Sequence, residues 1–343
     1  MKCSRLFVFL LFLLSFVSVH GQIQTTEGTD FWFSFIENST IDSSSYSIYV
    51  ASRSPSHGTI TCSNSTWSHT FDITPDQFTV VQIPKEQLSF VENQIDSCSF
   101  HVVTDAPISL FAVNYIDGSC GVTNIIPTPA VANDYMLQSY HSNSYNGIEV
   151  FRVISLQNNT LVHINRPNQA IQTIVLQQGE TYYSTDRSEL SGTKIWTDCD
   201  KKLAVFQGCK CACIPSGSSA CDIIFEEAIP TRYWGKSFAL TSSYSRSKDR
   251  FIVTALLNHT HLYLNDDIID LQSGESYEFE LTDSLPALFL FSNYPICVIQ
   301  YETGASYGGL NGDPSSSVIH PLEEGTTSLN FVTFSTIRVR HCY

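Results

Sequence analysis

Two stretches of the chain, one hundred residues apart, follow the same pattern. FRVISLQNNTLVHIN begins at Phe151, and FIVTALLNHTHLYLN begins at Phe251. Phe, Val, Leu, Asn and Thr recur at matching offsets, and a Leu-x-x-Gly-Glu-x-Tyr sequence follows each stretch, at Leu176 and at Leu271. Self-similarity at a fixed period is the mark of repeated structural units. We therefore expect the chain to fold as a series of similar units of about one hundred residues.

The repeated stretches have the period of β-strands. In TLVHI and THLYL the residues alternate in type with period two, as in a strand with one buried face. The pattern places four side chains inward, namely Val162, Ile164, Leu262 and Leu264. It places three outward, namely His163, His261 and Tyr263. The Gly-Glu pair that follows indicates a hairpin turn between two strands.

The cycle extends to the whole chain. An apolar strand signal occurs at residues 105–115, 200–208 and 293–301, and a proline segment and a further strand follow each one. We expect an all-β fold of three tandem antiparallel β-sandwich-like units at 22–133, 134–234 and 235–343. A propeller-like ring is the alternative arrangement. The stretch from Asn330 to Arg340 resembles the opening strand of a fourth unit. It is expected either to close the third unit as a partial strand or to mark where a longer protein was cut.

The N-terminus predicts secretion. Lys2 and Arg5 precede an apolar run from Leu6 to Val17, which is typical of a signal peptide at residues 1–21. The run is too short to span a bilayer comfortably. The mature chain would then begin at Gln22 and be extracellular.

Charge excludes some partners. Removing Lys2 and Arg5 lowers the formal charge from −15 to −17. A surface this acidic argues against binding to nucleic acid or to anionic membranes. The hydrophobic content of 43% is that of a globular protein. Abundant Ser, Thr, Tyr and Phe favour β structure.

The loop CKCACIPSGSSAC, residues 209–221, holds four cysteines. Cysteines of a secreted chain usually pair. Of the eleven, Cys3 leaves with the signal peptide, so ten remain, an even number. The spacing lacks the Cys-x-x-Cys units of zinc and thioredoxin-like sites. It predicts disulfides, whose connectivity the spacing alone leaves open.

Four Asn-x-Ser/Thr sequons agree with secretion. They predict surface positions for N-linked glycans at Asn38, Asn64, Asn158 and Asn258.

Catalytic and metal motifs are weak. Gly304 to Gly308 matches the G-x-S-x-G nucleophile elbow at Ser306, but a glycine-rich loop follows it where a helix is needed. His259 and His261 form a His-x-His pair without an evident third ligand.

Two carboxylate pairs, Glu226-Glu227 and Asp266-Asp267, are expected in turns or on solvated faces. Adjacent strand residues point to opposite faces, so neither pair is an obvious acid/base dyad. Calcium at Asp266-Asp267 stays open, and no other cofactor is expected.

Several segments together resemble the N-terminal domain family of IgGFc-binding protein. They are GTDFWFSF, ELSGTKIWTDCDKKLAVFQG, IPSGSSACDIIFEEAIPTRYWGKSF and LQSGESYEF, and the resemblance spans Gly28 to Pro321. It implies a disulfide between Cys213 and Cys221. Cys62 and Cys98, which lie within the first unit, are the second candidate pair.

The resemblance implies a secreted, non-enzymatic binding or structural module of mucus, surface defence or extracellular matrix. Antibody binding is not carried over, because no motif here is known to bind an Fc fragment. The expected partner is an extracellular protein or glycan, with disulfide-linked self-association through Cys342 or the Cys209/Cys211 pair as a further option. A carbohydrate-binding lectin-like protein is the alternative, and a serine hydrolase at Ser306 is the second alternative.

Overall fold

The computed structural model describes residues 26–40, 43–144, 147–243, 248–282, 284–304, 307 and 312–325. The expected signal peptide, Ser306 and Cys342 lie outside these residues. The described chain consists of β-strands joined by turns and by short 3-10 helices at Lys85–Gln87, Thr231–Tyr233 and Leu322–Glu324. The prediction of an all-β protein is confirmed.

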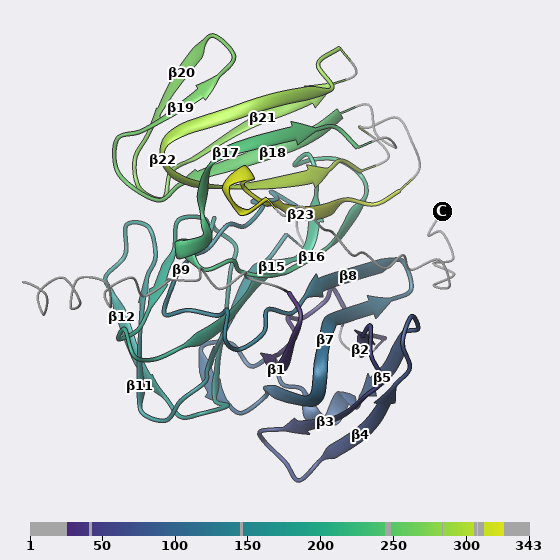
Figure 1. Ribbon diagram of the computed structural model, residues 1–343. Coiled ribbons are helices and arrows are strands. Elements are labelled where there is room, and N and C mark those ends of the chain that lie inside the picture. Colours follow the sequence, from purple (N-terminus) through teal and green to yellow (C-terminus); the bar gives the residue numbers. More distant parts are fainter. Residues whose placement is uncertain are drawn as a thin grey trace, which may run out of the picture.

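Three groups of strands occupy three parts of the molecule (Figure 1). Unit 1 contains β1 (Gly28–Phe33), β2 (Ser45–Ala51), β3 (Ser56–Cys62), β4 (Ser68–Ile73), β5 (Thr79–Ile83), β6 (Gln94–Asp96), β7 (Phe100–Ile116) and β8 (Ser119–Asn124). Unit 2 contains β9 (Asp134–Met136), β10 (Glu149–Ser155), β11 (Thr160–Asn165), β12 (Gln172–Leu176), β13 (Thr181–Asp186), β14 (Lys194–Trp196), β15 (Leu203–Cys213) and β16 (Cys221–Glu227). Unit 3 contains β17 (Gly235–Thr241), β18 (Lys248–Ala255), β19 (Thr260–Leu264), β20 (Asp267–Leu271), β21 (Ser276–Thr282), β22 (Ala287–Glu302) and β23 (Ser315–Ile319).

The same pairing order occurs in each group. In unit 1 the first half of the long strand β7 pairs with β1 and β3, and its second half pairs with β2 and β8. Strand β22 has the same neighbours in unit 3, namely β17, β19, β18 and β23. In unit 2 the long strand is divided into β14 and β15. Each unit thus has an outer half-sheet and an inner half-sheet.

The predicted alternation along β11 and β19 is confirmed. Val162, Ile164 and Leu262 are buried, and Leu264 packs partly buried against the core of unit 3. His163 and His261 lie on the opposite face. Period-two alternation was sufficient here because only one face of these strands meets a core.

The inner half-sheet of unit 2 is buried on both faces. Val150 and Ile154 of β10 belong to a core that is shared with unit 1. Phe151 and Val153 of the same strand belong to a core within unit 2. Strand β6, which precedes residue 133, also pairs with β13. The unit boundaries at 133/134 and 234/235 stay predictions, since the units are joined by more than a linker.

The Gly-Glu turns are not hairpins, which corrects the sequence-based expectation. The turn at Gly179 joins β12 to β13, and these strands lie in different sheets. The Gly179 amide donates to Ser155 O at 2.8 Å, and the Gly274 amide donates to Ala255 O at the same distance. Both glycines have positive φ, 79° and 84°, a conformation that glycine adopts without strain.

Candidate functional site

The outer half-sheet of unit 3 exposes a cluster of large hydrophobic side chains. Phe289 and Phe291 of β22, Tyr263 of β19 and Ile268 of β20 are 59%, 42%, 37% and 63% exposed. They lie side by side, because Tyr263 is the register partner of both Phe291 and Ile268. The Tyr263 and Phe291 rings are 5.7 Å apart. We call these four residues the unit 3 outer face.

Polar and small residues surround the unit 3 outer face. His261 Nδ1 pairs with the Asp270 carboxylate. These two residues are opposite each other on β19 and β20, two residues along each strand from Tyr263 and Ile268. Ala239 and Ala287 are exposed beside Phe289. Aromatic side chains with a polar rim are typical of protein-binding surfaces.

The equivalent positions of unit 2 are more polar. Cross-strand register equates Phe289 with Lys194, Phe291 with Trp196, Tyr263 with His163 and Ile268 with Thr173. The Trp196 ring is stacked on His163, with the ring centroids 5.1 Å apart. Unit 2 does expose Leu161 and Val175, but this pair lies two residues along each strand from His163 and Thr173. The unit 3 outer face was not predicted from the sequence, although an alignment of the repeats extended to residues 194–196 and 289–291 reveals it.

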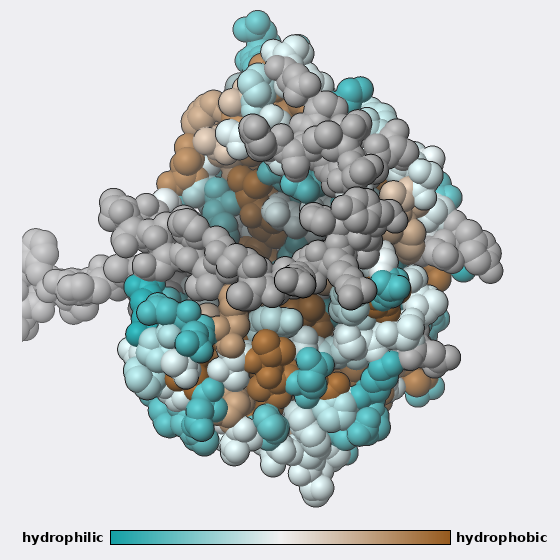
Figure 2. All heavy atoms as spheres, turned by 90° about the vertical axis from the view of Figure 1, so that its right-hand side faces the viewer, coloured by the Kyte–Doolittle hydropathy of each residue, from teal (hydrophilic) through white to brown (hydrophobic). Residues whose placement is uncertain are grey.

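Figure 2 shows the side of the molecule that lies to the right in Figure 1. Hydrophobic side chains are visible both on the flank of the upper part and as a group in the lower part.

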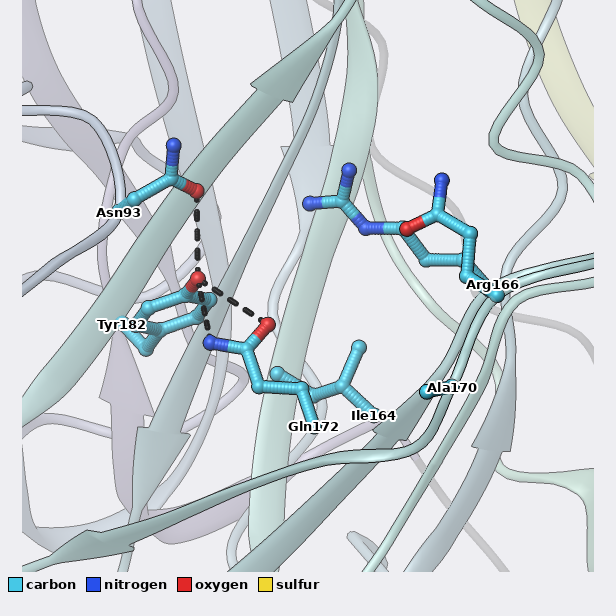
Figure 3. A pocket seen from close by; sticks show the side chains of 7 residues that line it. Asn93, Ile164, Arg166, Ala170, Gln172 and Tyr182 are labelled. Carbon is cyan, nitrogen blue, oxygen red and sulfur yellow. Dashed lines mark hydrogen bonds between the residues drawn. The ribbon is translucent and has the colours of Figure 1, made fainter.

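A separate polar pocket of about 280 Å³ lies in unit 2 beside a loop of unit 1 (Figure 3). Gln172 Nε2 donates to the Tyr182 hydroxyl at 2.9 Å, and that hydroxyl donates to Asn93 Oδ1 at 3.2 Å. Arg166 lies at the opposite side and pairs with Asp186 at 2.8 Å. Because these groups already bond one another, a polar ligand would have to displace existing hydrogen bonds.

Strand β16, near the centre of Figure 1, carries three acidic residues where the units meet. Asp222 and Glu227 are buried, and Glu226 is half-buried. Asp222 Oδ1 accepts hydrogen bonds from Ser119 Oγ and from the Cys120 and Ile223 amides. Burial raises the pKa of Asp222 to about 7, against the effect of these donors.

Glu226 and Glu227 lie on the same strand as Asp222. Glu226 accepts from Ser316 Oγ at 2.7 Å and from Thr123 Oγ1 at 3.4 Å. Burial raises its pKa to about 7, and it raises the pKa of Glu227 well above the ordinary value. The expectation of a turn or solvated face for this pair was wrong, because both faces of β16 meet neighbouring strands.

The arginine of β10 joins units 1 and 2. Arg152 is fully buried, and its guanidinium donates to Ser34 Oγ at 3.0 Å, to Cys98 O and to Ser89 O. It also lies over the rings of Phe90 and Tyr183, at 5.3 and 4.7 Å. The charge is thus stabilised by carbonyl oxygens and aromatic faces.

The cysteine-rich loop forms a different bridge from the expected one. Cys211 is bonded to Cys221, with their Cα atoms 5.2 Å apart, and Cys213 is not in this bridge. Cys213 is nevertheless the register partner of Cys221, across a ladder that shifts between Cys209 and Ala212. The resemblance implied a Cys213–Cys221 disulfide, but the structure has Cys211, two residues earlier, as the partner of Cys221.

Cys62 and Cys98 lie close together but are not bonded. Cys62 Sγ is 2.9 Å from Asn64 Oδ1, and Asn64 Nδ2 is 3.5 Å from Cys98 Sγ. Both thiols are buried, and burial raises the pKa of Cys98 to about 11. Their pairing stays a prediction.

One predicted glycan site is buried. The Asn38 side chain has no exposed surface, and it bonds to Asn114 and Ser119. A glycan there would displace these contacts, so the expectation of a surface position for Asn38 was wrong. The other three sequon asparagines, Asn64, Asn158 and Asn258, are exposed.

The structure does not bring the histidine and aspartate motifs together into a metal site within the described residues. His259 lies in the turn before β19 with a φ of 59°, so it does not share a strand face with His261. Asp266 and Asp267 are exposed. Among the described residues, no group of three or more His, Cys, Asp or Glu residues could hold a metal ion.

The described strands define an all-β protein with several sheets. A family model described as "IgGFc binding protein" matches residues 121–341, more than half of the chain. The chain therefore belongs to the IgGFc-binding protein family. The match begins in β8 and covers units 2 and 3.

Other comparisons carry less information. No curated protein matches the sequence. Similar solved structures include one titled for host cell surface retention of a bacterial ice-binding adhesin. It is 10% identical with a TM-score of 0.15, covering 79% of this chain and 86% of that one. An anti-sigma factor domain-containing protein is 8% identical with a TM-score of 0.17, covering 77% and 96%. The FN1–FN3 domains of chicken CNTN1 are 10% identical with a TM-score of 0.14, covering 86% and 98%.

Within the residues that the structure covers, no helix has the length and hydropathy needed to cross a bilayer.

Proposed function

We propose that this protein is a secreted, non-enzymatic binding or structural module of the IgGFc-binding type. It acts in mucus, surface defence or extracellular matrix, and it binds an extracellular protein through the unit 3 outer face. The observation that carries the proposal is the contrast between Phe289, Phe291, Tyr263 and Ile268 and their more polar equivalents in unit 2. Contiguous exposed hydrophobic residues on one of several equivalent faces mark an interaction surface.

A carbohydrate ligand is the second candidate. The Tyr263–Phe291 pair could stack on sugar rings, and the unit 2 pocket offers Arg166, Gln172 and Tyr182 to hydroxyl groups. The aromatic pair lies on strands and not in a loop, and the pocket groups are already paired with one another. A protein partner therefore fits better.

The test compares two surfaces on two forms of one probe. The secreted chain is measured by biolayer interferometry against purified mucin, native and enzymatically deglycosylated, with an IgG Fc fragment as a third probe. We expect binding to deglycosylated mucin that is lost in the Phe289→Lys/Phe291→Lys double variant and kept in Gln172→Ala. Binding that disappears on deglycosylation, or in Gln172→Ala alone, would favour the carbohydrate candidate.

A further inference from the structure

Consecutive units contact each other through the Gly-Glu turn. The turn of unit 2 lies on unit 1, where Ser99 Oγ donates to Gly179 O at 2.7 Å. A Cβ atom on Gly179 would lie 2.4 Å from Ser63 Oγ and 3.2 Å from the Trp32 ring. The contact therefore requires glycine in the turn.

The turn of unit 3 lies on unit 2 in the same manner. A Cβ atom on Gly192 would lie 2.6 Å from Gly274 O, so the two backbones touch. Met136, which is 1% exposed, packs beside this contact against Cys297 and the partly buried Leu256. Leu256 opens the Leu-x-Asn-x-Thr turn of unit 3, so two turns of one unit meet the preceding unit.

The strand registers equate the receiving positions. Trp32 pairs with His101, Met136 with Lys194 and Ala239 with Phe289. The residues two positions before His101, Lys194 and Phe289 are Ser99, Gly192 and Ala287, respectively. Each unit thus offers the same two positions to the next one.

In unit 3 these positions are exposed. Ser99 and Gly192 are buried, and so are Trp32 and Met136, whereas Ala239 and Ala287 are exposed. Both unit 3 residues have small side chains that allow close approach of a backbone. The unit 3 outer face continues directly from them through Phe289.

The sequence repeat follows this contact. Units 2 and 3, which each lie on a preceding unit, carry the Leu-x-Asn-x-Thr and Leu-x-x-Gly-Glu turns. The corresponding turn of unit 1, residues 74–78, holds Asp76 with a φ of 59° and is mostly exposed. A side chain at that point would block the close contact that Gly179 and Gly274 make. The shared motif is therefore explained by docking.

We propose that the unit 3 outer face, with Ala239 and Ala287, is the docking site for a further β unit of the same fold. That unit carries a Leu-x-x-Gly-Glu turn, whose glycine lies against Ala287, and it covers Phe289. The inference names the partner of the protein-binding role proposed above and rests on it. Unit 1 of a second copy does not fit, because Asp76 occupies its turn.

The test extends the chain by one unit. Residues 1–325 are followed directly by a second copy of residues 235–325, so that the new unit enters after Leu322–Glu324 as unit 3 enters after Thr231–Tyr233. The appended copy carries Phe289→Lys and Phe291→Trp, the residues that stand in unit 2. These changes also distinguish its peptides by mass. Hydroxyl-radical footprinting then measures the accessibility of the original Phe289 and Phe291.

We expect oxidation of Phe289 and Phe291 to fall several-fold relative to the unextended chain. The matched control carries Gly274→Asp in the appended copy only, in imitation of Asp76, and should restore the oxidation. Equal oxidation in the extended and unextended chains would overturn the proposal, and so would equal protection in the control. An appended unit that fails to fold also leaves both side chains accessible and counts against docking.

Two further measurements separate the possibilities. Sedimentation of the unextended chain should show a monomer, whereas a concentration-dependent dimer that Ala287→Arg abolishes would identify a second copy as the occupant and overturn the proposal. The mucin assay is independent of the extended chain. Loss of mucin binding in the Phe289→Lys/Phe291→Lys variant together with failure of docking would leave the proposed function standing and remove this inference alone.

Discussion

Replacing Asp222 by asparagine should change how the stability of the protein depends on pH. The Asp222 carboxyl group is 8% exposed, and burial raises its pKa from 3.8 to about 7. The folded chain therefore holds this proton more tightly than the unfolded chain does. The resulting stabilisation is fully present below pH 3.8 and is lost as the pH rises towards 7.

The size of the effect follows from the pKa difference. A shift of about 3 units corresponds to about 4 kcal/mol in the free energy of unfolding, at roughly 1.36 kcal/mol per unit. Asparagine keeps an acceptor oxygen for Ser119 and for the two amides, but it does not ionise. The stability of Asp222→Asn relative to the wild type should thus rise by up to about 4 kcal/mol between pH 4 and pH 8.

Urea unfolding at several pH values, followed by tryptophan fluorescence with the disulfides intact, measures this difference directly. Asp267→Asn, at the exposed start of β20, provides the background for removing one acidic residue. A difference between Asp222→Asn and the wild type that stays constant from pH 4 to pH 8 would refute the burial argument.

Four other results are expected. Arg152→Met should cost roughly 3 kcal/mol of unfolding free energy in urea, because it leaves buried acceptors without a donor, and Arg152→Lys should not restore it fully. Gly192→Ala should cost about 2 kcal/mol and lower the melting temperature, since its Cβ would overlap the facing turn. Glycopeptide mapping should find Asn38 unmodified and the exposed sequons occupied; a glycan at Asn38 in folded protein would contradict the packing. Disulfide mapping should show Cys62 joined to Cys98, and two free thiols there would remove that pair.

The strands were predictable where one face meets a core and the other meets solvent. The alternation in residues 160–165 specifies both the strand and its buried side, because the pattern and the packing are local. The Gly-Glu turns were located correctly but assigned the wrong connection. A left-handed glycine suits a hairpin and a crossing between sheets equally well, so the local sequence does not determine which sheet the next strand joins.

Other features depend on distant residues. The Asn38 side chain is buried by Asn114 and Ser119, which follow it by 76 and 81 residues. Cys211 lies within a register shift of β15, and it bonds to Cys221 although Cys213 is the residue in register with Cys221. Sequence spacing alone contains neither the burial nor the shift.

The acidic residues of β16 are enclosed because their strand belongs to the middle one of three units. Strand β16 belongs to the middle unit and packs against β8 of unit 1 and β23 of unit 3. Glu226 accepts hydrogen bonds from Thr123 on one side and from Ser316 on the other, so a single carboxyl group contacts all three units.

The positions of β8 and β23 that register equates with Glu227 are Asn124 and Val318, neither of which ionises. Ionisation of the β16 carboxyl groups therefore affects the contact with β8 of unit 1 and the contact with β23 of unit 3 together. The pH-dependent loss of stability should for that reason appear as one transition of the whole molecule and not as separate unfolding of one unit.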